Sequence, residues 1–551
     1  MIPPRVSGLV AAVAIAAAPL LGQLPRTVPE RSNYQHTSST AEVGAFLDSL
    51  QRSGAPLVVT EMGKSAGGRP NYLVIVSDPA VTSPGEAVAA GKLVVYLQAN
   101  IHGGEVEGKE AVQALLRELA GPRHALLDRL VILVAPVYNS DGNDAFGPQA
   151  QNRSEQNGPD PVGQRYDGLN LDLNRDYFKV EAPETRASLE RVYDRWDPAV
   201  MMDLHTTDGT LHGFLLTYAP PLDPNGPAGP TAWVRDQLLP AVRKTLQDKY
   251  KEAIFDYGDT DDQLKPTRWE TYAPLGWYGT NYVGLRGRMA ILSEAYSHAD
   301  FEKRIRVTHD FVAEILDYVA AHGDEIRRVE KDADRQTTLE GAGIMPRPEL
   351  AVAYEPASRG TEPVPLVVMR ANPDTAARRR ALPTDTVRTF SLPIFEHFRA
   401  TKTRALPAGY YLPPSERAIA ELLRLHGLLV ERLDVEWSDS VQVFGVKEEK
   451  WADRPFQGHK LLALAGDYAP AAVRALPAGT YFVPTAQPLG RLAFSLLEPE
   501  GYGLPRWNVF DRLLGADFGA YSGLVYGSTA VAEFPVWRAV RAPRAPRTAL
   551  P

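Results

Sequence analysis

The stretch "KLVVYLQANIHGGEVEGKEAVQALLRELAG", residues 92–121, joins three kinds of sequence. Its first part, 92–100, is almost continuously apolar, which is typical of a strand covered on both faces of a sheet. Its last part, 107–121, repeats apolar residues at helical spacing and stops at a glycine. Between them, a glycine-lined bend carries His102 and Glu105. This order predicts a strand, a polar bend and a helix, which is the repeating unit of an α/β fold.

Three further apolar runs extend this pattern along the chain. They occupy residues 129–139, 199–206 and 288–297. A second helical pattern, 300–323, begins at an aspartate and ends at a glycine, as capped helices do. Between about residues 33 and 332 we therefore expect one domain, built on a mixed, mostly parallel sheet with helices on both faces.

Composition limits the classes of protein to which the chain can belong. At 551 residues it is too long for one ordinary hydrophobic core, so two domains are expected. The formal net charge of -8 argues against a nucleic-acid or anionic-membrane partner. The sequence contains no Cys, so any metal ion must be bound by His and carboxylate side chains.

The N-terminus has the features of an export signal. Residues 1–23 carry one positive charge at Arg5 and then a short apolar run, which predicts a secretory signal peptide. The alternative is a membrane anchor, but the run is shorter than the roughly 20 residues that a spanning helix needs and contains Pro19. We expect a secreted or periplasmic protein without stable membrane association once the signal is removed.

The C-terminal part differs from the preceding residues in its sequence pattern. Periodicity is lost over residues 332–350, which predicts a domain boundary, and residues 350–540 are expected to form a smaller α/β or β-rich accessory domain. One phrase occurs there twice, as "RALPAGYYLPP" (404–414) and "RALPAGTYFVP" (474–484), which indicates a duplicated strand-turn unit. The tail, 538–551, is expected to lack regular structure. The sequence of this region shows no group of candidate catalytic residues, so structural support or substrate recruitment is its expected role.

Polar side chains follow the apolar runs at the strand ends, where ligands bind in open α/β sheets. His102 and Glu105 follow the first run, and His205 lies at the end of the third. A His-x-x-Glu pair by itself is more often a solvated loop beside a helix N-terminus. Together with His205 it supplies two imidazoles and one carboxylate, which is the ligand composition of a catalytic zinc site with one open position. We therefore expect one zinc ion per chain.

Glu294 is a charged residue inside an apolar run. Burial of an unpaired carboxylate is costly, so this side chain should face the crevice, where it can act as a general base. A structural ion pair with Arg286 or Arg288 is the alternative.

The adjacent pair Asn174 and Arg175 offers a carboxamide beside a guanidinium, which suits recognition of a planar carboxylate. A solvated loop with local charge pairing is the alternative for this stretch. Both features favour hydrolysis of an amide bond next to a free carboxylate.

Several ordered motifs between about residues 33 and 325 together resemble the zinc metallocarboxypeptidases of the carboxypeptidase A type. They are "GKSAGGRPNYLVIVS" (63–77), "HGGE", "NSDG" (139–142), "DLNRDY", "DLHT" and "ILSEAYS". The resemblance implies a zinc peptidase in which the substrate's terminal carboxylate is recognised. The residues it implies are His102, Glu105 and His205 for zinc, Glu294 as general base, Asn174 and Arg175 for the carboxylate, and Asp172 for orienting His102.

The resemblance also implies an arginine that stabilises the oxyanion, located between the "NSDG" and "DLNRDY" motifs. Arg153 is the first choice and Arg165 the rival. The sequence departs from the family's common pattern in having Asp176, where Asn usually follows the arginine. An acid there leads to the hypothesis that the substrate carries a basic or amide-bearing group.

The family has a tyrosine that caps the substrate before the catalytic glutamate. Tyr272 stands at the family's spacing from Glu294, while Tyr282 is expected to line the specificity pocket, and Tyr278 lies between them. We predict substrate contacts from Tyr272 and Tyr282.

These features predict an exported zinc carboxypeptidase that acts on peptide substrates. A zinc amidohydrolase of N-acyl amino acids or cell-wall peptides is one alternative. A catalytically silent binding protein is the other.

Overall fold

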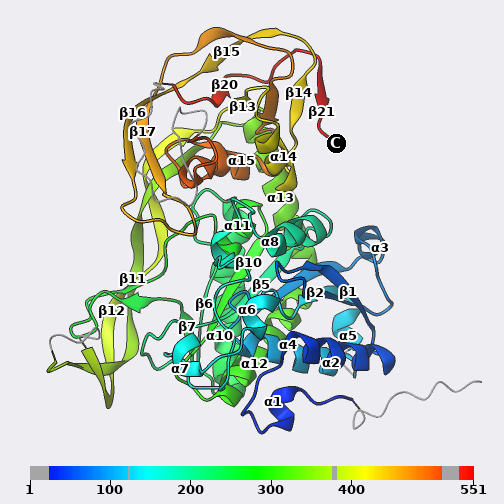
Figure 1. Ribbon diagram of the computed structural model, residues 1–551, viewed down its shortest axis with the longest axis vertical. Coiled ribbons are helices and arrows are strands. Elements are labelled where there is room, and N and C mark those ends of the chain that lie inside the picture. Colours follow the sequence, from blue (N-terminus) through cyan, green and yellow to red (C-terminus); the bar gives the residue numbers. More distant parts are fainter. Residues whose placement is uncertain (1–23, 122–123, 375–380, 512–532) are drawn as a thin grey trace, which may run out of the picture.

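The computed structural model describes residues 24–121, 124–374, 381–511 and 533–551 (Figure 1). The expected signal peptide, residues 1–23, lies outside these residues. An α/β part occupies the lower half of Figure 1, and the C-terminal region stands above it. Among the described residues, no helix combines the length and apolar character needed to cross a bilayer.

The lower part is built on an eight-stranded sheet with the order β1-β2-β4-β3-β5-β10-β6-β7. The pairs β3/β4, β3/β5, β5/β10 and β6/β7 are parallel and the other three are antiparallel, so the predicted mixed α/β sheet is confirmed. The four predicted runs form β3, β4, β5 and β10. The strands are β1 (Leu57–Lys64), β2 (Pro70–Val76), β3 (Leu93–Ala99), β4 (Leu130–Ala135), β5 (Val200–Thr206), β6 (Leu216–Ala219), β7 (Ile254–Asp256) and β10 (Met289–Ala295).

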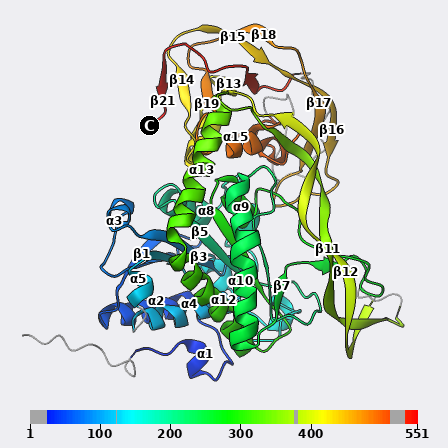
Figure 2. The same ribbon diagram turned by 180° about the vertical axis from the view of Figure 1, so that it is seen from behind.

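Helices cover one face of this sheet, and several of them, such as α10, lie toward the viewer in Figure 2. Side chains alternate along a strand, so Leu97 and Ala99 of β3 point to this face and Tyr96 to the other. Leu97 and Ala99 belong to a buried cluster with residues of the covering helices, such as Leu116 and Phe311. The helices are α2 (Thr40–Arg52), α4 (Glu107–Leu119), α10 (Leu239–Thr245) and α12 (Phe301–Ala321).

The opposite face is covered by α8 (Pro183–Ser188), α11 (Gly279–Leu285) and part of the C-terminal region. Tyr96 lies in a single buried cluster with Tyr282 of α11 and Tyr410 of the C-terminal region. The Tyr282 hydroxyl lies 2.9 Å from His426 Nδ1. The two halves of the chain therefore share one hydrophobic core.

Both predicted helices are present, as α4 and α12. A further helix, α13 (Gly323–Gly341), follows α12 and rises toward the C-terminal region (Figure 2). It includes residues 332–341, where the sequence shows no helical periodicity. The periodicity is missing because only a few widely spaced side chains of α13, including Ile326 and Ala333, are buried. The remaining helices are α1 (Val28–Arg31), α3 (Pro84–Ala89), α5 (His124–Leu127), α6 (Ser140–Asp144), α7 (Gln149–Asn152), α9 (Ala228–Trp233), α14 (Arg417–Leu425) and α15 (Gly490–Leu497).

The C-terminal region contains a seven-stranded sheet with the order β18-β15-β20-β13-β19-β14-β21. The two copies of the repeated phrase contribute β13 and β19, which pair antiparallel with Tyr410 opposite Val483. The tail was wrongly expected to lack regular structure, because β21 pairs with β14 through a contact that is distant in sequence. The strands are β13 (Gly409–Leu412), β14 (Glu431–Leu433), β15 (Trp437–Gln442), β18 (Ala472–Leu476), β19 (Tyr481–Pro484), β20 (Trp537–Ala539) and β21 (Arg547–Ala549).

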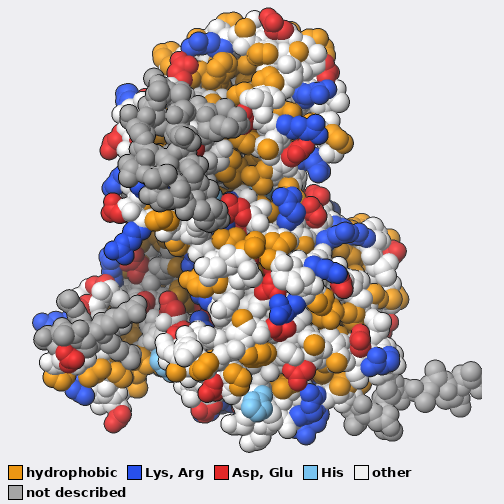
Figure 3. Space-filling model, in the orientation of Figure 1, with side chains coloured by type: hydrophobic (Ala, Val, Ile, Leu, Met, Phe, Trp, Pro, Cys, Tyr) orange, Lys and Arg blue, Asp and Glu red, His pale blue; other side chains and the backbone are white. Residues whose placement is uncertain are grey.

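Two hairpins complete the fold. The long pair β11 (Glu349–Ala371) and β12 (Ala381–Ala405), here called the arm, runs down from the C-terminal region beside the lower part (Figure 1). It joins a small sheet with β8 (Asp259–Thr260) and β9 (Trp269–Glu270). The second hairpin pairs β16 (Phe444–Trp451) with β17 (Leu462–Tyr468). On the face shown in Figure 3, acidic and basic side chains are interspersed.

Candidate active site

Three side chains converge where β3 and β5 end. His102 and Glu105 lie in the bend between β3 and α4, and His205 is near the end of the neighbouring parallel strand β5. Nδ1 of His102 is 2.9 Å from Glu105 Oε1, and Nδ1 of His205 is 3.0 Å from Glu105 Oε2. The two Nδ1 atoms are 3.2 Å apart. The predicted set is therefore assembled, with one possible ligand atom from each residue within 4.8 Å of the others.

The bend is shaped by Asn100, which has a φ of 63°. Its side-chain nitrogen lies 3.2 Å from the carbonyl oxygen of His102, 3.1 Å from that of Gly103 and 2.9 Å from that of Glu105. Gly103 packs so closely on the next loop that a Cβ atom there would lie 2.2 Å from the carbonyl carbon of Gly142. A larger residue would therefore push the bend and its two ligand side chains out of place.

The outward nitrogen of each imidazole faces a carboxylate. His102 Nε2 lies 3.1 Å from Asp172 Oδ1, and His205 Nε2 lies 3.1 Å from Asp203 Oδ2. Gln98 holds the second carboxylate by donating to Asp203 Oδ1 at 3.0 Å. Protein metal sites commonly pair each ligating His with such an acceptor, which fixes the tautomer and leaves the other nitrogen free to bind metal. Two imidazole nitrogens and one carboxylate, directed at one point, fit zinc.

Charge is concentrated around these ligands. Burial alone would raise the pKa of Glu105, but His102 and Arg153 hold it well below its usual range. Burial would likewise lower the pKa of His205, but Asp203 and Glu105 raise it well above its usual value. The site is thus a buried arrangement of opposite charges in which the carboxylate of Glu105 is ionised.

Glu294 lies beside the ligands, on the strand next to His205. In the parallel pairing of β5 and β10, Glu294 is directly opposite His205. Burial raises the pKa of Glu294 well above its usual value, against the attraction of His205. The two arginines considered as ion-pair partners of Glu294 bind other groups. The first, Arg288, pairs with Asp197 and Asp334. The second, Arg286, donates to the carbonyl groups of His426 and Tyr193.

A cavity of ≈ 110 Å³ opens onto these groups. The predicted clamp residues Asn174 and Arg175 line it. Asn174 Oδ1 accepts the backbone N–H of Gly279 at 2.9 Å, and the Arg175 guanidinium carbon lies 4.4 Å from the ring centroid of Tyr278. The lining residues are His102, Glu105, Arg165, Asn174, Arg175, His205, Thr206, Asp208, Tyr257, Tyr272, Tyr278, Thr280, Leu292 and Glu294.

The two candidate arginines occupy different positions. Arg153 is buried behind Glu105, with a nitrogen 3.1 Å from Oε1 of that residue, and it does not line the cavity. Arg165 lines the cavity and bonds to Asp172 Oδ2 through two nitrogens, at 2.9 and 2.8 Å. Of these two arginines, only Arg165 is therefore open to a bound substrate.

The tyrosines also differ from the prediction. Tyr272 lines the cavity, with its hydroxyl 3.0 Å from Thr280 Oγ1, and Tyr278 lines it as well. Tyr282 is fully buried in the shared core, so the prediction that it contacts substrate does not fit the structure. The sequence places it one helical turn from Tyr278, but that turn faces the C-terminal region.

Asp176 does not face the cavity either. Its carboxylate is fully buried, 2.6 Å from Lys179 Nζ, and accepts the backbone N–H groups of Glu181 and Ala182 at 3.0 and 2.9 Å. This side chain holds its own loop together, so the hypothesis that it selects a basic substrate group is not supported.

Several residues of the site were not predicted from the sequence, among them Asp203, Asp208 and Tyr257. Asp203 could have been found, because it lies two residues before His205 on the same strand and hence on the same face. Asp208 and Tyr257 line the cavity from loops and have no such periodic signal.

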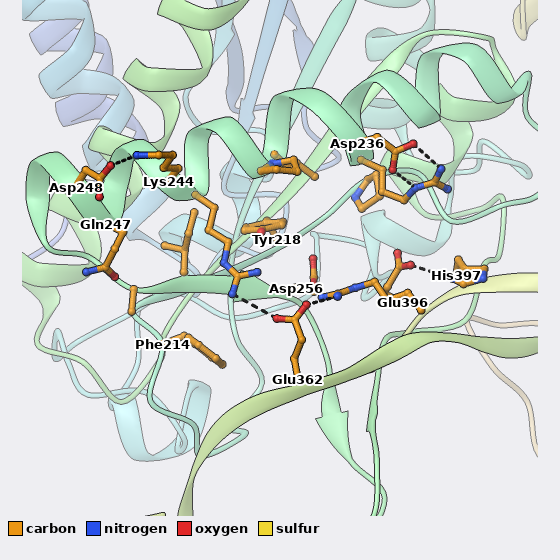
Figure 4. A pocket seen from close by; sticks show the side chains of 18 residues that line it. Phe214, Tyr218, Asp236, Lys244, Gln247, Asp248, Asp256, Glu362, Glu396 and His397 are labelled. Atoms are coloured by element: carbon orange, nitrogen blue, oxygen red, sulfur yellow. Dashed lines mark hydrogen bonds and ion pairs between the residues drawn. The ribbon is translucent and has the colours of Figure 1, made fainter. Parts of the chain in front are cut away.

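A larger cavity, of ≈ 1020 Å³, lies away from this site, between α10 and the arm. Figure 4 shows that its charged side chains are paired, Lys244 with Asp248 and His397 with Glu396. It contains none of the residues around His102 and His205.

Comparisons with known proteins also point to zinc carboxypeptidases. Residues 43–219 match the model of the zinc carboxypeptidase family, a range that includes the three converging side chains but ends before Glu294. The chain is 25% identical over 516 residues to carboxypeptidase 2 of Trichophyton equinum, covering 87% of this chain and 85% of that protein. It is 24% identical over 494 residues to carboxypeptidase 2 of Trichophyton rubrum, covering 83% and 80%.

Among solved structures, a metallo-carboxypeptidase from Burkholderia cenocepacia is 18% identical, with a TM-score of 0.38 over 52% of this chain and 70% of that one. Residues 43–219 thus match a zinc carboxypeptidase domain, and this match together with the named relatives supports a hydrolase of the metallocarboxypeptidase class.

Proposed function

We propose that the protein is an exported zinc carboxypeptidase that hydrolyses the peptide bond next to a free C-terminal carboxylate. The observation that carries the proposal is the presence, around one cavity, of the His102, Glu105 and His205 set, the carboxylate of Glu294 and the guanidinium of Arg175. The two histidines and Glu105 suit a metal ion. Glu294 suits proton transfer, and Arg175 suits binding of a substrate carboxylate.

His102, Glu105 and His205 would hold one zinc ion per chain. When bound there, zinc supplies a Lewis acid that polarises a carbonyl group. Asp172 and Asp203 keep the imidazoles in the orientation that this requires.

Glu294 is proposed as the general base. Its carboxylate takes a proton from the attacking water and then gives it to the departing amine. Burial favours the protonated form of Glu294, whereas a cation in the site favours the ionised form, so the proton can move in both directions.

Substrate binding is assigned to the residues on the other side of the cavity. Asn174 and Arg175 would hold the terminal carboxylate, and Tyr272 or Tyr278 would cover the bound residue. Arg165 is preferred to Arg153 for stabilising the developing oxyanion, since its guanidinium faces the cavity.

Export is proposed from the sequence of residues 1–23. The proposed partner is a peptide substrate, without nucleic acid or stable membrane association after the signal is removed.

A matched pair of blocked dipeptides tests the proposal. One ends in a free carboxylate and the other in a carboxamide, with the same side chains. We expect hydrolysis of the free acid at least about 100-fold faster in kcat/KM, because a charged pair to Arg175 is lost in the amide. Equal rates, or cleavage of N-acyl amino acids alone, would contradict carboxypeptidase activity.

A further inference from the structure

The β16–β17 hairpin of the C-terminal region ends in a tight turn. The backbone N–H of Phe456 bonds to the carbonyl of His459 at 2.7 Å, and the reverse bond is 3.0 Å long. The two central residues, Gln457 and Gly458, have φ values of 52° and 77°. Positive φ at both central positions is the pattern of a type I′ turn.

This turn contacts a catalytic loop, residues 172–181, at both ends. Gln457 Oε1 accepts the backbone N–H of Asp172 at 2.7 Å. His459 Nε2 lies 2.7 Å from Glu181 Oε1. Trp507, also from the C-terminal region, has its ring centroid 5.6 Å from Lys179 Nζ, within the range of a cation–π contact.

The contacted loop carries three groups of the site. Asp172 lies against His102 Nε2, and Asn174 and Arg175 line the cavity. A displacement of this loop would move a partner of a metal ligand and the carboxylate clamp together.

Gln457 is an unusual residue for its position. Gly and Asn adopt positive φ at little cost, whereas a longer side chain does so rarely. The turn itself would be satisfied by glycine, but glycine has no side-chain acceptor for the Asp172 N–H. The contact, and not the turn geometry, therefore accounts for a long amide side chain here.

We propose that the turn 456–459 is a positioning element of the active site and that Gln457 is a positioning residue for the loop 172–181. The C-terminal region thereby takes part in substrate-carboxylate recognition without touching the substrate. This inference rests on the proposed function for its kinetic readout, but its effect on metal binding can be measured independently.

The test is Gln457→Gly in the full chain. This change keeps the turn conformation and removes the acceptor. We expect KM for the free-acid dipeptide to rise roughly 10-fold, with kcat changed less than about 2-fold, since the clamp binds the same carboxylate before and during reaction. The preference for free acid over amide should fall by the same factor. Zinc affinity, measured by competition with a chromogenic chelator, should fall roughly 10-fold, because Asp172 supports His102.

Arg454→Ala is the matched control, because Arg454 lies on the same connecting segment and is exposed. It should leave KM, the acid preference and zinc affinity unchanged. His459→Leu provides a second variant, which removes the contact to Glu181 and should shift KM in the same direction. It also keeps the proposal testable if Gln457→Gly folds poorly.

Unchanged KM, acid preference and zinc affinity in both folded variants would overturn the positioning role. An inactive wild-type protein would instead contradict the proposed function, and the chelator competition would then decide the inference alone.

Discussion

Asp203 and His205 lie two residues apart on β5 with their side chains on one face, so that Asp203 Oδ2 is 3.1 Å from His205 Nε2. Gln98 on the adjacent strand holds Asp203, and Tyr177 donates to Gln98 at 2.9 Å. A chain of buried polar groups thus runs from the core to a proposed metal ligand. It fixes which nitrogen of His205 faces the site.

Asp203→Asn should weaken zinc binding. The amide cannot stabilise the orientation of His205 as a carboxylate does, and loss of such a partner costs roughly 10- to 100-fold in metal affinity. Competition with a chelator measures the change. Asp197→Asn, a change at a half-exposed carboxylate that pairs with Arg288, is the control and should keep the wild-type affinity. The same affinity in Asp203→Asn as in wild type would mean that Asp203 is only a structural acid.

Glu294→Gln should retain zinc but lose activity. The amide preserves the shape of the side chain and cannot accept a proton, so kcat should fall by about 100- to 10,000-fold. Steady-state kinetics and elemental analysis of the same sample check both expectations. Substantial turnover by the zinc-loaded variant would exclude Glu294 as the base.

The two arginines should give different defects. Arg165→Ala is expected to lower kcat by roughly 100-fold or more with little change in metal content, since it removes a donor open to the substrate. Arg153→Ala should instead lower the stability and zinc affinity, because it leaves the buried Glu105 without its nearest guanidinium. Thermal unfolding, zinc affinity and kcat, compared between the variants, separate the roles. The reverse pattern would favour Arg153 as the oxyanion residue.

Stability should depend on pH through Asp223, a buried residue outside the metal-binding set. Burial raises its pKa from 3.8 to about 7, against one hydrogen bond from the Asn225 N–H. Because the folded state holds this proton more tightly, the contribution of Asp223 to stability is fully present below about pH 4 and is lost as the pH rises from there to about 7. The shift of about 3 units corresponds to about 4 kcal/mol.

Asp223→Asn removes this titration while keeping an oxygen for Asn225. The variant should therefore be more stable than wild type at pH 8.5, and the difference in unfolding free energy should shrink toward pH 5. Denaturant unfolding at several pH values measures it. A difference that is independent of pH would show that Asp223 is not titrating in this range.

The sequence predicted the parts of this protein that depend on local pattern. Continuous apolar runs mark β3, β4, β5 and β10 because both faces of the sheet are covered, and the strand ends then bring His102, Glu105 and His205 together. Parts that depend on distant contacts were not predictable. Tyr282 is buried by the C-terminal region, and the tail becomes a strand only by pairing with β14.

The conformations of loops could not be predicted from the sequence either. Arg153 and Arg165 both follow the same motif, and nothing in their spacing indicates that one turns behind Glu105 and the other into the cavity. Gln457 stands 285 residues from the Asp172 N–H that it accepts, so no local signal marks it. Asp203 is the exception, since its spacing of two from His205 was visible.

Metal content is the most direct test of the central claim. Elemental analysis of the purified mature protein should find about one zinc per chain, and the double variant with His102→Ala and Glu105→Ala should lose both the zinc and the hydrolysis of the free-acid dipeptide. The same zinc content in the double variant as in wild type would mean that these side chains do not form a metal site, and the proposed function would have to be abandoned.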